Sequence, residues 1–309
     1  MKTKHLLFVI GFAVAISGCH KNNDLIPGNT EEPVSENLSV NKIPNAVNTI
    51  IANNTYLYPS GGSSAILFKG GTNVTFDTYG KVLIGTVVNN TYLYPAGGSS
   101  TILFKASTEV TFVYGQNAKV EKGTLVNNTY LYPSGGSSTI LFQANTQVTF
   151  VIGENAKVRR GILQNNTYLY PSGGSSTILF LAGTEVIFAA GQNGKVQHGT
   201  LVNNTYLYPT GGSSTILFKA STIVYFAAGQ NGKVERATLV NNTYLYPTGG
   251  SSTILFRAGT EIFFGAGFTG KVRTGTLQNN TYLYPSGGSS TILFSAGSVV
   301  TFDNFGKVV

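Results

Sequence analysis

Two residue types recur once in every repeated unit of the sequence and could bind a ligand. Lysine fills one equivalent position seven times: Lys81, Lys119, Lys157, Lys195, Lys233, Lys271 and Lys307. Tyrosine occurs in pairs within the phrase Asn-Asn-Thr-Tyr-Leu-Tyr-Pro: Tyr56 and Tyr58, Tyr92 and Tyr94, Tyr130 and Tyr132, Tyr168 and Tyr170, Tyr206 and Tyr208, Tyr244 and Tyr246, Tyr282 and Tyr284. A Lys row could attract an anionic polymer, and exposed Tyr rings can stack on sugars. Both rows also have structural interpretations, as solvated residues beside turns and as cross-strand packing pairs, and these alternatives stay open.

Residues suited to catalysis are scarce in the same region. The repeated part contains eight acids, two Asp and six Glu. Glu109, Glu185 and Glu261 hold equivalent places in alternate units, and no spacing predicts the carboxylate pair that glycoside hydrolysis requires. His198 is the only repeat-region His, at a position held elsewhere by Lys, Arg or Thr. We therefore predict no catalytic residue, no metal and no cofactor, and leave a glycan-active enzyme as the least favoured alternative.

The composition limits the classes further. Charged residues make up 10% of the 309 residues, against about 25% in a typical soluble domain. The single Cys cannot form an intrachain disulfide or a thiolate metal cluster. Fourteen of the 38 Gly belong to a Gly-Gly pair that follows the Tyr-Pro turn signal in each of the seven units.

The first 18 residues have the features of an export signal. Lys2 and Lys4 precede an eleven-residue apolar run, Leu6–Ile16, which is too short to span a bilayer as a helix. The following sequence, Ile16-Ser17-Gly18-Cys19, resembles the lipobox of bacterial lipoproteins. This resemblance implies that residues 1–18 are removed and that Cys19 carries the lipid that anchors the protein to a membrane. It also implies sorting to the outer membrane, because His20 stands where Asp favours retention on the inner membrane. Residues 19–45 are then expected to form a flexible tether.

Residues 46–309 are predicted to form one all-β domain of seven units. The Asn-Asn-Thr-Tyr-Leu-Tyr-Pro phrases are 36 residues apart once and 38 residues apart five times. In the unit 203–240, the period of two predicts strands near 205–208, 215–218, 222–226 and 233–240. Residues 47–52 supply an extra strand ahead of the first unit, similar to the fourth strand of the unit 203–240. Part of the unit, residues 231–239, resembles hairpin repeats of the MORN type.

Apolar residues on both faces of the first two strands predict that each is covered on both sides. The favoured architecture is a β-solenoid, in which like residues stack from coil to coil, and the alternative is a seven-bladed β-propeller.

These observations favour a binding module over an enzyme. We expect a lipid-anchored cell-envelope protein that binds or adheres multivalently to an anionic or neutral polysaccharide, or to another envelope polymer. The alternative is a purely structural surface or spacer protein without a specific ligand. Nucleic acid is not an expected partner of an exported protein, despite the net charge of +8.

Overall fold

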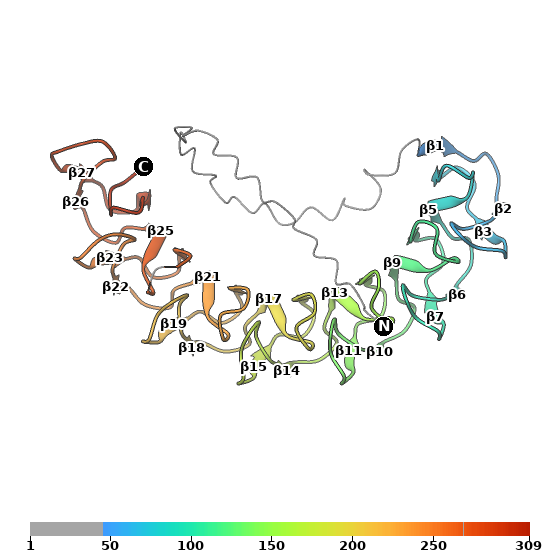
Figure 1. Ribbon diagram of the computed structural model, residues 1–309, viewed down its shortest axis with the longest axis horizontal. Helices are drawn as coiled ribbons and strands as arrows, with labels where there is room; N and C mark the ends of the chain where they lie inside the picture. The colour runs from blue at the N-terminus through green and yellow to red at the C-terminus, as the bar shows by residue number, and fades with distance from the viewer. Residues whose placement is uncertain (1–45, 268) are drawn as a thin grey trace, which may run out of the picture. The chain divides into compact units, whose positions relative to one another are not determined.

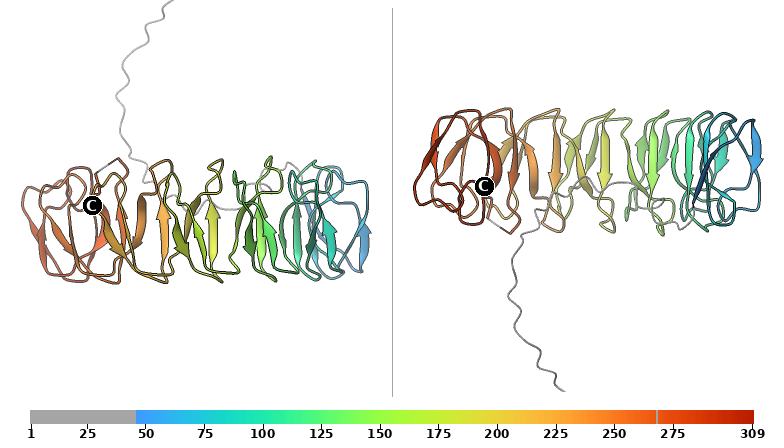
Figure 2. Two further views of the ribbon diagram at one scale, coloured as in Figure 1. Left: turned by 90° about the horizontal axis from the view of Figure 1, so that it is seen from below. Right: turned by 90° about the horizontal axis from the view of Figure 1, so that it is seen from above.

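The computed structural model describes residues 46–267 and 269–309, which contain 28 β-strands and no helix. Fourteen strands form one long sheet, and the others form seven two-stranded hairpins that cover one face of it (Figures 1 and 2). The long sheet consists, in order, of β1 (Val47–Ile50), β4 (Asn73–Phe76), β5 (Val82–Thr86), β8 (Glu109–Phe112), β9 (Val120–Thr124), β12 (Gln147–Phe150), β13 (Val158–Ile162), β16 (Glu185–Phe188), β17 (Val196–Thr200), β20 (Ile223–Phe226), β21 (Val234–Thr238), β24 (Glu261–Phe264), β25 (Val272–Thr276) and β28 (Val299–Thr301).

The hairpins pair successive short strands of three residues each. They are β2 (Thr55–Leu57) with β3 (Ile66–Phe68), β6 (Thr91–Leu93) with β7 (Ile102–Phe104), β10 (Thr129–Leu131) with β11 (Ile140–Phe142), β14 (Thr167–Leu169) with β15 (Ile178–Phe180), β18 (Thr205–Leu207) with β19 (Ile216–Phe218), β22 (Thr243–Leu245) with β23 (Ile254–Phe256), and β26 (Thr281–Leu283) with β27 (Ile292–Phe294). The all-β prediction and the four strands of the unit 203–240 are confirmed, with boundaries that differ by one to two residues. The extra strand ahead of the first unit is β1, which pairs with β4.

The long sheet is open, with β1 and β28 as its outermost strands. A propeller has separate four-stranded blades arranged in a ring, so the propeller alternative was wrong. All the strand pairs of the long sheet are antiparallel. Along the sheet, the third strand of a unit, such as β20, alternates with the fourth, such as β21. Like residues of successive units are therefore two strands apart in this sheet.

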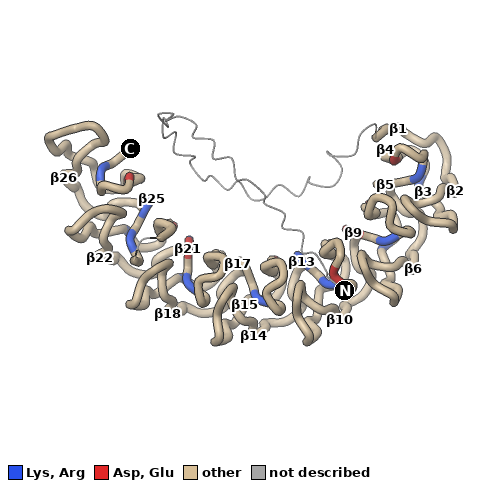
Figure 3. The backbone as a smooth tube through the Cα atoms, in the orientation of Figure 1, with Lys and Arg blue, Asp and Glu red and all other residues tan. Residues whose placement is uncertain are grey.

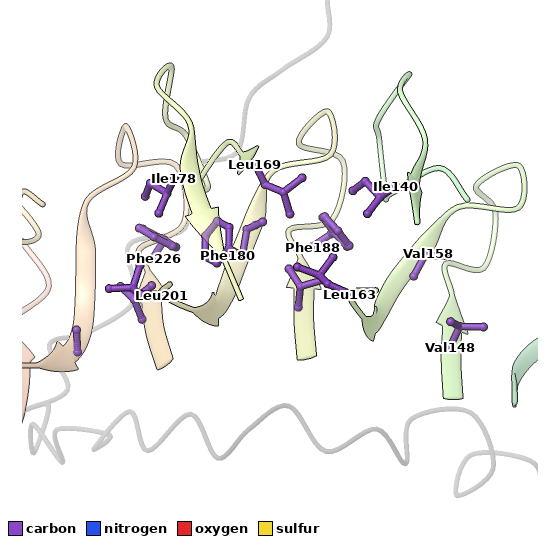
Figure 4. Packing of buried hydrophobic residues seen from close by; sticks show 14 of the residues in the cluster. Ile140, Val148, Val158, Leu163, Leu169, Ile178, Phe180, Phe188, Leu201 and Phe226 are labelled. Atoms are coloured by element: carbon purple, nitrogen blue, oxygen red, sulfur yellow. The ribbon is translucent and has the colours of Figure 1, made fainter. Parts of the chain in front are cut away.

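The hydrophobic core lies between the hairpins and the long sheet (Figure 4). Each hairpin contributes one Phe to this core. Phe180, for example, is fully buried and meets Phe226 of the next unit edge to face, with ring centroids 6.4 Å apart. In five units, the fourth strand carries a Gly beneath the hairpin Phe of the same unit. At Gly161, an added Cβ would lie 2.6 Å from Cδ1 of Phe142, so the small residue makes room for the aromatic ring. The core thus continues from unit to unit.

The turns also join consecutive units. The backbone N–H of Gly194 donates to the carbonyl oxygen of Ser134 in the preceding unit over 2.7 Å, and corresponding bonds recur along the chain. Gly135 has a φ of +66° at this contact, and an added Cβ would lie 2.6 Å from the backbone nitrogen of Asn193. Part of the Gly excess therefore serves close packing between turns as well as the turns themselves.

Candidate ligand-binding surface

The hairpin Tyr side chains form the most regular exposed surface. In β10 and β11, Tyr130 stands opposite Leu141, whereas Leu131 stands opposite Ile140. Opposed residues share a face of the hairpin, so the Leu131 and Ile140 side chains, 7% and 6% exposed, point to the core and Tyr130 points outward.

The exposure repeats in every hairpin. The first Tyr of each pair is 66–69% exposed and the second is 44–53% exposed. The prediction that both faces of these strands are covered was therefore wrong. A Tyr side chain pairs an apolar ring with a hydroxyl that stays hydrated, so this face can meet water although its residues count as apolar. We call these fourteen side chains the Tyr face.

Packing between Tyr rings does not account for this surface. Among the described residues, no ring–ring contact joins two members of the Tyr face, and the cross-strand partner of each first Tyr is a Leu, as in Tyr206 opposite Leu217. The aromatic surface that each hairpin presents is thus open to a ligand.

The Lys row holds the turns of its own units. The side-chain amine of Lys233 donates to the carbonyl oxygen of Gly212 over 2.8 Å, at the second Gly of the Gly-Gly pair. Equivalent bonds are made by Lys81, Lys119, Lys271 and Lys307. All seven Lys residues, Lys157 and Lys195 included, are half-buried. At Lys119 the amine also lies 4.5 Å from the ring centroid of Tyr94. These contacts support the structural interpretation of the Lys row.

The Asn-Asn-Thr segment positions the Tyr strands. The side-chain oxygen of Asn166 accepts the backbone N–H of Ala182 over 2.8 Å, which ties the start of one hairpin strand to the turn after the other. The Thr167 hydroxyl donates to the carbonyl oxygen of Asn165 over 2.7 Å. The phrase that repeats in the sequence is therefore a hydrogen-bonded support for the Tyr face.

The other face of the long sheet carries a second row of side chains. Register places one residue per strand directly opposite the next, including Arg160 and Ile187, then His198, Tyr225, Arg236 and Phe263. The alternating residues of these strands, such as Val224 and Ile262, point to the core and are fully buried. We call the row from Arg160 to Phe263 the central row.

Within the central row, His198 is confined between charged and aromatic groups. Its ring centroid lies 4.7 Å from that of Tyr225. Burial, together with the positive charges of Arg160 and Arg236, lowers the pKa of His198 from 6.5 to about 4. His198 is therefore uncharged at neutral pH.

The two Arg residues of this row are paired with acids. Arg236 forms an ion pair with Glu261 over 3.5 Å and Arg160 forms one with Glu185. Two of the three equivalent Glu residues noted in the sequence thus balance cations on neighbouring strands. Sequence reasoning missed this row, because its members lie in different units. The signal was the departure of Ile187, Tyr225 and Phe263 from the Thr that the other four units carry at the same position of the third strand.

Charged groups of the described residues do not gather at one point. Lys, Arg, Asp and Glu are spread over the units (Figure 3). Within residues 46–267 and 269–309, no group of three or more His, Cys, Asp or Glu is arranged to hold a metal ion. In the same residues, no helix is long and apolar enough to cross a membrane. The predicted lipid attachment point, Cys19, lies outside the described residues.

No protein-family model matches the chain, and no curated protein matches it.

Proposed function

We propose that this protein binds a repeating polymer, with polysaccharide as the favoured class, through the Tyr face. The observation that carries the proposal is the outward exposure of an equivalent Tyr pair on each of the seven hairpins. In this proposal the domain is an open, solenoid-type array of seven units.

The polymer would be bound by many weak, equivalent contacts. A Tyr side chain offers an aromatic surface to a sugar ring and a hydroxyl that can donate or accept a hydrogen bond. Tyr also loses little conformational entropy on binding, because it has few rotatable bonds. When the target repeats, each additional engaged hairpin acts at high effective concentration and can raise affinity by orders of magnitude.

The Lys row supports an alternative ligand, an anionic polymer. Five of its amines each donate one of their three N–H groups to a Gly carbonyl oxygen, and all seven Lys side chains are half-buried, so an anion would approach amines that are partly covered. The first Tyr of each pair is at least 66% exposed, and the Tyr face is therefore the favoured surface. A purely structural protein remains the second candidate function, because the hairpins and turns pack the array together without any ligand.

The envelope location belongs to the same proposal. The lipobox resemblance supports export and attachment of lipid to Cys19, with outer-membrane sorting from His20. A Cys19→Ala variant is expected to leave the membrane fraction of a bacterial host, and continued partition with membranes would contradict lipidation at this residue.

A set of matched substitutions tests the Tyr face. We expect the fold to tolerate replacement of the first Tyr of every pair by Ser, since each is at least 66% exposed. We expect this sevenfold variant to lose at least tenfold in affinity for a polysaccharide found on a glycan array, whereas replacing one Tyr changes affinity little.

Two controls make this result specific. The first replaces the exposed Ser after each Gly-Gly pair by Ala, on the same hairpins: Ser63, Ser99, Ser137, Ser175, Ser213, Ser251 and Ser289. The second replaces all seven Lys residues by Ala. Loss of binding only in the Lys variant would move the proposal to the Lys row, and no glycan binding by the unmodified protein would leave the structural alternative.

A further inference from the structure

The central row differs from the Tyr face in being unlike from unit to unit. One position of the third strand is Thr in four units, as Thr75, Thr111, Thr149 and Thr301. The other three units carry Ile187, Tyr225 and Phe263 there. The two aromatic residues therefore occur in two adjacent units, where the pattern of the chain supplies a short hydroxyl side chain. Aromatic side chains at this position are therefore confined to one stretch of the sheet, which makes that stretch a candidate for a single local site.

These substitutions build one continuous stack across four strands. His198, Tyr225, Arg236 and Phe263 come from β17, β20, β21 and β24, and each stands directly opposite the next. The Arg236 guanidinium carbon lies 3.6 Å from the ring centroid of Tyr225 and 5.2 Å from that of Phe263. The guanidinium is thus held between two aromatic rings, which fixes its orientation.

The stack ends beside short side chains. The residue opposite Phe263 on β25 is Thr274, and the next one, on β28, is Thr301. Their hydroxyl oxygens are 3.1 Å apart. Side chains of opposed residues stand side by side on a pleated sheet, so Phe263 has the Arg236 guanidinium on one side and hydroxyl groups on the other. An apolar ring next to paired hydroxyls and an oriented Arg–Glu pair matches the two kinds of surface on a sugar ring.

Charge decides between a neutral and an acidic ligand. Arg160 and Arg236 are balanced by Glu185 and Glu261, two positive against two negative groups. His198 adds no charge at neutral pH. Glu235 on β21 and Arg273 on β25, both exposed, add one charge of each sign, so the patch has no excess cation. A carboxylate or phosphate brought to it would also meet Glu261, whose side chain is 43% exposed.

We infer that the sheet face around Tyr225, Arg236, Glu261 and Phe263 is a second, single-copy binding site for one uncharged sugar unit of a polysaccharide. The sugar stacks its apolar face beside Phe263. Its hydroxyls pair with the exposed part of the Arg236–Glu261 ion pair and with Thr274 and Thr301. The inference rests on its own surface and stands or falls apart from the Tyr face.

The test uses the full-length protein in which the seven first Tyr residues of the Tyr face are already replaced by Ser. Neutral hexose hexasaccharides of differing linkage, and a uronic acid hexasaccharide as the charged comparison, are titrated and followed by calorimetry and by NMR shifts. We expect millimolar to micromolar binding of a neutral hexasaccharide with one site per chain. Adding Tyr225→Thr and Phe263→Thr should weaken the binding of this hexasaccharide at least tenfold. Thr is the residue that most other units carry at this position, so the fold is expected to persist.

Ile187→Thr, in the same row without an aromatic side chain, is the control and should bind like its parent. Three results would overturn the inference: no neutral hexasaccharide bound in the Tyr-to-Ser background, unchanged affinity after the two aromatic substitutions, or tighter binding of the uronic acid compound. None of these results bears on the first Tyr of each pair, which is absent from every variant in this experiment.

Discussion

Phe180→Ala should weaken the coupling between neighbouring units far more than the same change in the last hairpin. Phe180 is fully buried and meets Phe226 of the following unit at 6.4 Å. Truncating a buried Phe to Ala costs about 3–5 kcal/mol, of which the aromatic pair accounts for about 0.5–1.5 kcal/mol.

Phe294 is the matched control, because it follows the same Ile-Leu sequence but is only partly buried. Its neighbour Ile292 is 50% exposed, against 7% for Ile178. A partly buried side chain contributes a fraction of the roughly 1.5–3 kcal/mol that full burial provides, so Phe294→Ala should cost about 1 kcal/mol. The difference between the two variants is then about 2–4 kcal/mol.

The assay is urea unfolding followed by circular dichroism and by Tyr fluorescence, which 17 Tyr and no Trp make a clean probe. Native-state hydrogen exchange should show that Phe180→Ala lowers protection mainly in β15 and β20, since each unit contacts only its neighbours. Equal losses in the two variants, or a loss of protection spread evenly over all hairpins, would refute the reasoning that the Phe contacts couple one unit to the next.

Three further predictions concern single positions. Gly161→Val should lower the urea midpoint by the equivalent of about 1–3 kcal/mol because it crowds the Phe ring above it, whereas Gly161→Ala should cost less, since Ala237 occupies the equivalent position in another unit. The folded-state pKa of His198, about 4, lies below its unfolded value of 6.5, so its contribution to stability is complete above pH 6.5 and is lost as the pH falls towards 4. Urea midpoints at pH 7 and pH 4.5 should therefore differ less in His198→Gln than in the unmodified protein, and an equal difference would contradict the burial of the neutral ring. Asn166→Ala should destabilise the protein by about 0.5–1 kcal/mol, because the backbone N–H it accepts turns to water, and unchanged thermal unfolding would show that this bond contributes nothing.

Much of the local structure could be predicted from the sequence. The period of two, interrupted by Gly, Asn and Pro, placed the strands of the unit 203–240 within one to two residues. Turn chemistry also explained the Gly-Gly pairs. What the pattern misjudged was burial: Tyr206 and Tyr208 were counted as apolar and expected to be covered, yet they are 66% and 49% exposed. A hydropathy pattern cannot tell an aromatic ring in the core from one that keeps its hydroxyl in water.

The sequence by itself determined the β class, the strands and the turns, because these depend on residues that are close together along the chain. It also determined that the Lys and the Tyr pair each recur once per unit, at intervals of 36 or 38 residues. Only the tertiary structure decided that the Lys amines bond to Gly carbonyls while the Tyr rings face solvent. It also decided that His198, Tyr225, Arg236 and Phe263, from three different units, stand side by side. The physical reason is register: which residues oppose one another across antiparallel strands depends on how the strands pair and on the bulges between them, and a shift of one residue would turn every side chain to the other face.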